Sequence, residues 1–233
     1  MCQGAFGQRV GELYAKIAGM TVSVHLVRHG EVFNPDKVLY GRLPGFGLSA
    51  LGQQMAQELA DGWNQTPAIL VSSPLQRARE TIAPMAKKFD LDVRLESRVL
   101  EAENKFEGLS DMRRRLRSPK LWPLVLNPLR PSWGEPYAQQ AARVAEAIQD
   151  LRDELMTTYG PGSCAIVVSH QLPIWVTRLS AEGKLLAHDP RRRECSLASV
   201  TSFEFTPGQR IPTVHYTEPV EHLSKQAAAL PGA

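Results

Sequence analysis

The chain has 233 residues, of which 43% are hydrophobic and 22% are charged, and its formal net charge at pH 7 is +3. This length suits one α/β domain with a full hydrophobic core and is short for two, and the composition is that of an ordinary globular protein. The small net charge gives no reason to expect nucleic-acid binding, and three cysteines without a Cys-x-x-Cys pair argue against a disulfide framework.

The sequence shows no targeting or membrane-spanning pattern. No apolar run approaches the roughly 20 residues that a membrane helix needs, and charges at Arg9, Glu12 and Lys16 argue against a signal peptide. The cysteine usage fits a reducing compartment, so we expect a cytoplasmic protein with no membrane partner. Met20 stands just before the first predicted strand and is an alternative start, so residues 1–21 are interpreted as an N-terminal extension of the fold.

Strands and helices are predicted to alternate along most of the chain. Short apolar runs indicate buried strands, and apolar side chains that repeat every three or four residues indicate helices. In chain order the predicted elements are a strand at 22–27, a helix capped by Ser49, a strand at 68–71, a helix at 75–89, a strand at 90–95, a helix at 137–159, a strand at 164–168, a helix from about 171, and strands at 199–205 and 213–217. This alternation predicts a three-layer α/β fold, with a mainly parallel central sheet and helices on both faces.

One segment interrupts the alternation. Residues 108–136 are rich in Pro, Trp and Arg and are predicted to be an insertion folded over the sheet as a lid. We expect this insertion to control which substrates are accepted, with Arg113, Arg114 and Arg115 either in solvent or in contact with a charged substrate. The domain is thus predicted to span 22–224, with 225–233 as a disordered tail.

Cationic or imidazole side chains follow three of the predicted strands. The strand at 22–27 leads into Arg28 and His29, the strand at 68–71 is followed by Arg77, and the strand at 164–168 by His170. In open α/β sheets, ligands bind beyond the carboxyl ends of the strands. If the three strands are neighbours, these side chains and the free amides of the following helices meet at one edge. The sequence therefore predicts a site for a dianionic phosphate.

The residues at these positions resemble the histidine phosphatase superfamily, in its phosphoglycerate-mutase-like branch. The resemblance runs from about 22 to 205. It rests on four motifs in order, which are Leu26-Val27-Arg28-His29-Gly30-Glu31 with Asn34, Gly41-Arg42 with Leu48-Ser49-x-x-Gly52, Ser73-Pro74-Leu75-x-Arg77-Ala78 with Glu80-Thr81, and Val168-Ser169-His170. It implies an enzyme that needs no metal and no cofactor.

The resemblance also implies roles for single residues. His29 would attack phosphorus, while Arg28, Arg77 and His170 would hold the phosphoryl oxygens and stabilise the charge that develops on them. A neutral imidazole is nucleophilic at pH 7 without a separate base. The remaining phosphate-binding candidates are Asn34, Arg42 and, where the family usually has glycine, Gln171.

A glutamate of the segment 100–108 is expected to move the protons. The family uses one glutamate both to protonate the leaving group and to activate water, and Glu101 aligns best with it. The spacing to the following Glu-Gly is one residue shorter than usual, so Glu103 and Glu107 remain alternatives. Distinctive mutase residues are not recognised in this segment.

The predicted activity is hydrolysis of a small phosphomonoester through a phosphohistidine. Two alternatives are phosphoryl transfer of the phosphoglycerate-mutase type and a catalytically silent phosphate-binding protein. The partner is a small phosphorylated substrate, and the sequence leaves room for a homodimer. The segment 188–195, with three consecutive arginines, is interpreted as a structural or solvated loop, with substrate contact as the alternative.

Overall fold

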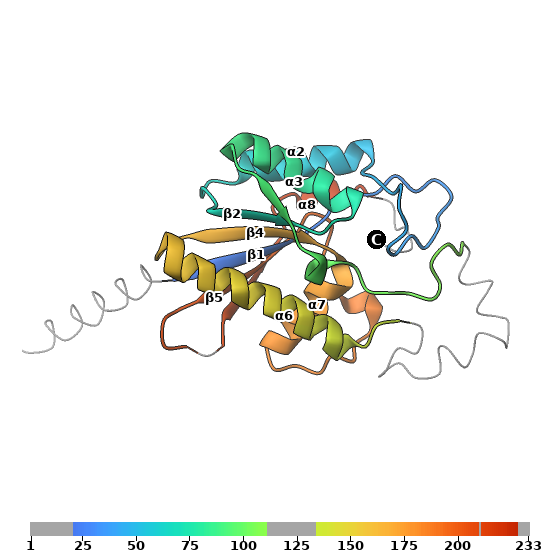
Figure 1. The fold of residues 1–233 in the computed structure, drawn as a ribbon. Coiled ribbons are helices and arrows are strands. Elements are labelled where there is room, and N and C mark those ends of the chain that lie inside the picture. Colours follow the sequence, from blue (N-terminus) through green and yellow to red (C-terminus); the bar gives the residue numbers. More distant parts are fainter. Residues whose placement is uncertain (1–20, 111–133, 210, 228–233) are drawn as a thin grey trace, which may run out of the picture.

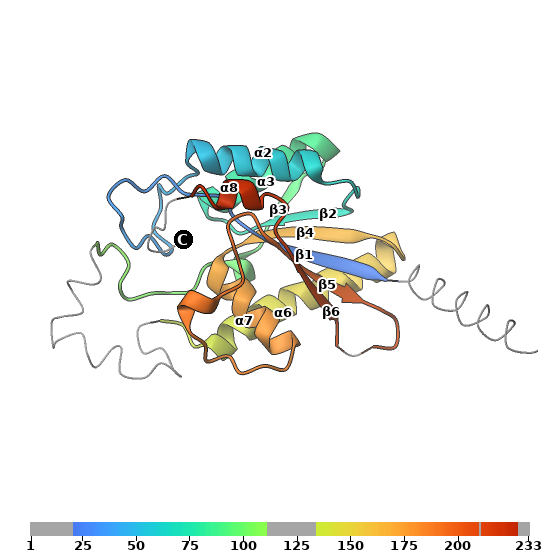
Figure 2. The same cartoon turned by 180° about the vertical axis from the view of Figure 1, so that it is seen from behind.

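A six-stranded sheet forms the centre of the protein. The computed structural model describes residues 21–110, 134–209 and 211–227, and within them the strand order is β3-β2-β4-β1-β5-β6 (Figures 1 and 2). Strands β3, β2, β4 and β1 are parallel, β5 is antiparallel to β1, and β6 is antiparallel to β5. The strands are β1 (Val22–Arg28), β2 (Ile69–Ser72), β3 (Val93–Leu95), β4 (Cys164–Ser169), β5 (Val200–Phe205) and β6 (Thr213–Thr217).

Helices cover both faces of this sheet, as predicted. Helices α2, α3 and α8 lie on one face and α6 and α7 on the other, which Figures 1 and 2 show from opposite sides. The helices are α2 (Ala50–Gly62), α3 (Gln76–Phe89), α6 (Tyr137–Glu154), α7 (Gln171–Ala181) and α8 (Glu221–Ser224), with short turns at Ser97–Val99, Leu155–Tyr159 and Pro190–Arg192. Strands β2 and β4 are buried along their whole length, because a strand covered by helices on both faces meets no water.

Local backbone chemistry explains where the predicted elements begin and end. The Ser49 side chain accepts a hydrogen bond from the Gly52 amide and starts α2, as the sequence predicted. The strand predicted at 90–95 is shorter, because Asp90 adopts a left-handed conformation with φ 53° and ends α3. The four-residue helix α8 was not predicted, and no side chain caps its N-terminus.

Several predictions concern residues outside the described ranges. Nearly all of the N-terminal extension at 1–21, most of the lid at 108–136 and the end of the tail at 225–233 lie there. Of the tail, Ala227 packs against the core on the α2–α3 face of the sheet. In the described part of the chain, no helix combines the length and apolarity that crossing a membrane requires.

Candidate active site

The three predicted strand ends do meet at one edge of the sheet. Strand β4 lies between β1 and β2, and its pairing places Ser169 beside Arg28 and Val168 beside Ser72. His29 and His170 follow these strands directly, and their ring centroids are 5.2 Å apart. The Nε atom of Arg77, on the first turn of α3, donates to Nε2 of His29 at 3.3 Å. The sheet order thus assembles the predicted site.

The loop after β1 is held tightly against α2 and α3. The Gly30 amide donates to the Thr81 hydroxyl at 3.1 Å. A Cβ atom on Gly30 would lie 2.6 Å from the Gly52 carbonyl oxygen, so this close approach requires glycine. His29 therefore projects from a backbone that has little room to move.

His29 is prepared to act through Nε2. Its Nδ1 lies 2.8 Å from the Gly30 carbonyl oxygen, and since that oxygen can only accept, Nδ1 carries the proton. Burial and the nearby charges of Arg77 and Arg28 lower the pKa of His29 well below 6.5. The ring is therefore neutral at pH 7, with its lone pair on Nε2.

Arg28 and Arg77 are buried cations that form no ion pair with a carboxylate of the described residues. Their residues are only 4% and 1% exposed. Arg28 donates to the Cys195 carbonyl at 2.6 Å, Arg77 donates to the Gly41 carbonyl at 2.7 Å, and the Arg77 guanidinium stacks on Tyr40. Their hydrogen bonds go to neutral groups. Two such guanidinium groups beside His29 have the chemistry that suits an anionic ligand.

His170 completes the arrangement with an unused nitrogen. Its Nε2 lies 2.8 Å from the Ser73 hydroxyl, and burial, Arg77 and His29 lower its pKa well below 6.5. Within the described residues, His170 Nδ1 and Arg28 Nε are buried without a hydrogen-bond partner. Leaving a buried polar atom unsatisfied costs about 1–3 kcal/mol, so both atoms favour an incoming oxygen ligand.

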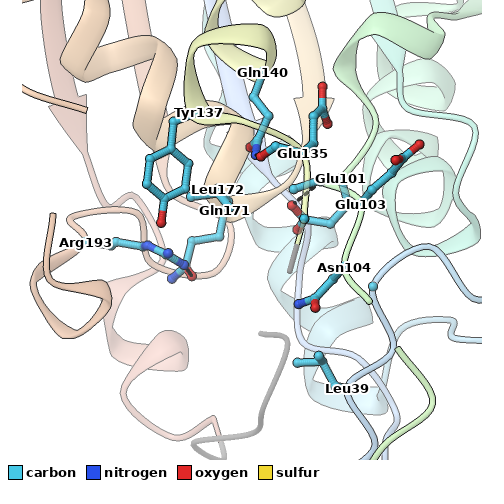
Figure 3. A pocket seen from close by; sticks show the side chains of 13 residues that line it. Leu39, Glu101, Glu103, Asn104, Glu135, Tyr137, Gln140, Gln171, Leu172 and Arg193 are labelled. Atoms are coloured by element: carbon cyan, nitrogen blue, oxygen red, sulfur yellow. Dashed lines mark hydrogen bonds between the residues drawn. The ribbon is translucent and has the colours of Figure 1, made fainter. Parts of the chain in front are cut away.

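A pocket of about 170 Å³ opens beside this cluster. Figure 3 shows Tyr137, Gln171 and Arg193 on one side and Leu39, Glu101 and Asn104 on the other. Its lining residues are Leu39, Gly41, Glu101, Ala102, Glu103, Asn104, Gly134, Glu135, Tyr137, Gln140, Gln171, Leu172 and Arg193.

Glu101 is the carboxyl group that the structure places among the site's cations. Burial raises its pKa above 4.5, against the lowering effects of the Ala102 amide, Arg77, Arg193 and Arg28. A half-buried carboxyl with a raised pKa suits a general acid.

The other two glutamates face elsewhere. The Glu103 side chain is 70% exposed and pairs with Arg42 at 2.9 Å. Glu107 accepts a hydrogen bond from the Arg42 amide at 2.9 Å. Both carboxylates have partners outside the histidine cluster, and of the three candidates the geometry favours Glu101 as the proton donor.

Arg42 and Asn34 have their polar groups engaged away from the two histidines. The Arg42 guanidinium contacts the Glu101 carbonyl, Glu103 and Glu135. The Asn34 amide bonds twice to the backbone of Val38 and closes that loop. A phosphate-binding role for either residue stays a prediction that these contacts do not support.

Gln171 lines the pocket, as the prediction requires, at the start of α7. Its Oε1 accepts from Nη1 of Arg193 at 3.2 Å. Sequence reasoning missed Arg193 as well as Ser73, Tyr40 and the Cys195 carbonyl. For Arg193 the available signal was the three-arginine run, which was interpreted as a structural or solvated loop.

The fold and the site together define a class of protein. Two neutral histidines and two buried arginines at the carboxyl edge of a doubly covered sheet are typical of an α/β protein that binds and transfers phosphoryl groups. The chain belongs to the histidine phosphatase superfamily (branch 1), whose family model matches residues 24–217. This confirms the predicted family and fold class, and the class of enzyme is a histidine phosphatase.

Several known proteins are similar to this chain in sequence or in fold. An uncharacterized protein of Mycobacterium tuberculosis is 47% identical over 204 residues, which cover 84% of this chain and 96% of that protein. A mycobacterial glucosyl-3-phosphoglycerate phosphatase has a similar structure, with a TM-score of 0.68, 23% identity and coverage of 84% of this chain and 97% of that one. A phosphoserine phosphatase of Entamoeba histolytica, solved with 3-phosphoglyceric acid, has a TM-score of 0.70 and 22% identity, and the match covers 87% of this chain and 99% of that one.

Proposed function

We propose that the protein hydrolyses small phosphomonoesters through a phosphohistidine formed on Nε2 of His29. The observation that carries this proposal is the state of the His29 ring, which is neutral, with Nδ1 bonded to the Gly30 carbonyl and Nε2 facing Arg77. The related folds include phosphatases named for glucosyl-3-phosphoglycerate and phosphoserine, which supports a small phosphorylated metabolite as substrate.

The first step transfers the phosphoryl group to the enzyme. The lone pair on Nε2 of His29 attacks phosphorus as the ester P–O bond breaks. Arg28, Arg77 and His170 donate to the phosphoryl oxygens and stabilise the transition state. The Glu101 carboxyl gives its proton to the leaving oxygen, so the alcohol departs neutral and Glu101 becomes a carboxylate.

The second step regenerates the enzyme. The Glu101 carboxylate takes a proton from a water molecule, which attacks phosphorus while the P–N bond to His29 breaks. Inorganic phosphate leaves, and Glu101 is again protonated. In a mutase, a second hydroxyl group of the substrate would accept the phosphoryl group in place of water. Release of inorganic phosphate therefore distinguishes the two activities.

The test is release of inorganic phosphate from para-nitrophenyl phosphate and from an alkyl phosphate, measured in the presence of a chelator. The native protein is expected to turn over both, and His29→Ala is expected to lose at least about 10⁴-fold in kcat. His222→Gln is the matched control, since the His222 side chain is 64% exposed, and it should retain full activity. A native protein inactive on every phosphomonoester, or an active His29→Ala variant, would contradict the proposal and favour a silent phosphate-binding protein.

A further inference from the structure

Arg193 lies in the wall of the pocket, across from Glu101 (Figure 3). Its Nε donates to Nε2 of His188 at 2.9 Å and its Nη1 donates to Oε1 of Gln171 at 3.2 Å. Both partners are neutral acceptors. His188 Nδ1 lies 2.7 Å from the Leu186 carbonyl, so the proton is on Nδ1 and Nε2 can accept from Arg193.

The preceding turn separates Arg193 from the other two arginines of its run. Asp189 caps the turn Pro190–Arg192 and pairs with Arg191, whose side chain is 88% exposed. Arg192 is also exposed, whereas Arg193 is half-buried against the pocket. The nearby carboxylate is thus used by Arg191, and among the described residues Arg193 forms no ion pair.

Part of the Arg193 guanidinium remains free to bind a ligand. A guanidinium has five N–H groups, and the bonds to His188 and Gln171 use Nε and Nη1. Nη2 has no hydrogen-bond partner among the described residues, and it is not one of their fully buried, unsatisfied atoms. Since Arg193 lines the pocket, these N–H groups are available to a ligand there.

Arg193 is also close to the phosphate-binding arginines. The Cys195 carbonyl accepts from Arg28 at 2.6 Å, and the amide of Gln171, which holds Arg193, lies 3.5 Å from the same carbonyl. Arg193 and Glu101 attract each other, while Arg193 and Arg28 repel. When Glu101 carries its catalytic proton, its charge no longer balances Arg193, and the pocket favours a further negative charge.

We propose that Arg193 binds a second anionic group of the substrate, a carboxylate or a second phosphate, beside the phosphoryl group that is transferred. The inference rests on the proposed function, which it makes more specific. The favoured substrate is a phosphomonoester whose alcohol carries an acidic group a few bonds from the ester oxygen. The free Nη2 of the guanidinium would donate a charge-assisted hydrogen bond to an oxygen of such a group.

Binding to a variant that cannot turn over tests this inference separately from catalysis. In the His29→Ala protein, calorimetry would compare 3-phosphoglycerate with glycerol 3-phosphate, which carries a hydroxymethyl group in place of the carboxylate. The carboxylated ligand is expected to bind about 10- to 100-fold more tightly, as a charge-assisted hydrogen bond allows. Adding Arg193→Gln should reduce this ratio to about two, whereas Arg192→Gln, the exposed neighbour, should leave it unchanged.

Three results would overturn the role of Arg193. The first is equal affinity for the two ligands before Arg193 is changed. The second is that Arg193→Gln weakens both ligands by the same factor. The third is that Arg192→Gln lowers the affinity ratio as much as Arg193→Gln does. Arg193→Lys keeps the charge and should recover part of the ratio, which a purely structural role would not produce. All of these binding measurements use the inactive His29→Ala protein, so they do not depend on turnover. A native protein that fails the hydrolysis assay would therefore count against the proposed function and not against this binding site.

Discussion

Two groups of arginines lie close together in this protein and differ in their partners. Arg28, Arg77 and Arg193 face the histidine cluster or the pocket, and among the described residues their hydrogen bonds go only to neutral acceptors. Arg42 and Arg143 instead have a carboxylate partner, since they share Glu135, and both also contact the Glu101 carbonyl.

This difference in partners separates arginines that are available to bind a ligand from arginines that stabilise the fold. A buried cation without a counter-ion is unfavourable in the free protein, and it is expected where a ligand supplies the missing charge. A partly buried cation with a bidentate carboxylate partner stabilises the fold. The inner group, Arg28, Arg77 and Arg193, should therefore control activity, and the outer group, Arg42 and Arg143, should control stability.

The largest effect is expected at Arg77. Arg77→Met removes donors aimed at the phosphoryl group, each worth about 10²–10³-fold, so kcat/KM should fall by about 10⁴-fold or more. The free energy of unfolding, measured with urea, should change by less than about 1 kcal/mol, because a buried and unpaired charge is replaced by an apolar side chain of similar length. A variant that loses stability and keeps activity would reverse the assignment.

The next effect concerns Glu101. Glu101→Gln should lower kcat for an alkyl phosphate by about 10²–10³-fold, since general acid catalysis contributes in that range. An aryl phosphate with a weakly basic leaving group needs little help, so its loss in the first step should be much smaller. Single-turnover kinetics would separate the two steps, and equal losses on both substrates in the first step would move the role to Glu103 or Glu107.

Glu101 also predicts how stability and activity depend on pH. The pKa of Glu101 is higher in the folded protein than its ordinary value of 4.5. Its ionisation therefore lowers the free energy of unfolding as the pH rises above 4.5, and the full loss is reached above the folded pKa. Well below pH 4.5 the group is protonated in both the folded and the unfolded state, so it has no effect on stability. Glu101→Gln should thus be more stable than the native protein at pH 7 and equally stable at pH 3. The alkyl phosphatase activity of the native protein should decline on the basic side as Glu101 ionises, and this decline should be absent in the variant.

The sequence predicted the strand-end residues because local patterns determine them. His29, Arg77 and His170 each follow a short buried strand, and only the order of these strands in the sheet was needed to bring the three side chains together. Arg193 could not be placed in this way, since it lies in an irregular segment where a single turn decides which arginine faces inward. The choice of Glu101 also depended on the tertiary structure, because only packing shows which of three nearby carboxyl groups lies near Arg77, Arg193 and Arg28.

The smallest effect on activity is expected in the outer group. Arg143 binds both carboxylate oxygens of Glu135, at 2.7 and 2.9 Å, and the pair is largely buried. Arg143→Met should reduce the free energy of unfolding by about 1–3 kcal/mol, while kcat/KM for an aryl phosphate stays within about fivefold. Arg94→Gln is the control, since its pair with Glu154 is exposed and should contribute less than about 1 kcal/mol.

The central claim is that phosphorus is covalently bound to His29 during turnover. The direct measurement is a rapid alkaline quench after mixing the protein with a phosphorus-labelled aryl phosphate, followed by peptide mapping. The account predicts an acid-labile, alkali-stable label on His29, formed no more slowly than turnover and absent in His29→Ala. Turnover with no label at any quench time, or a label on another residue, would contradict it.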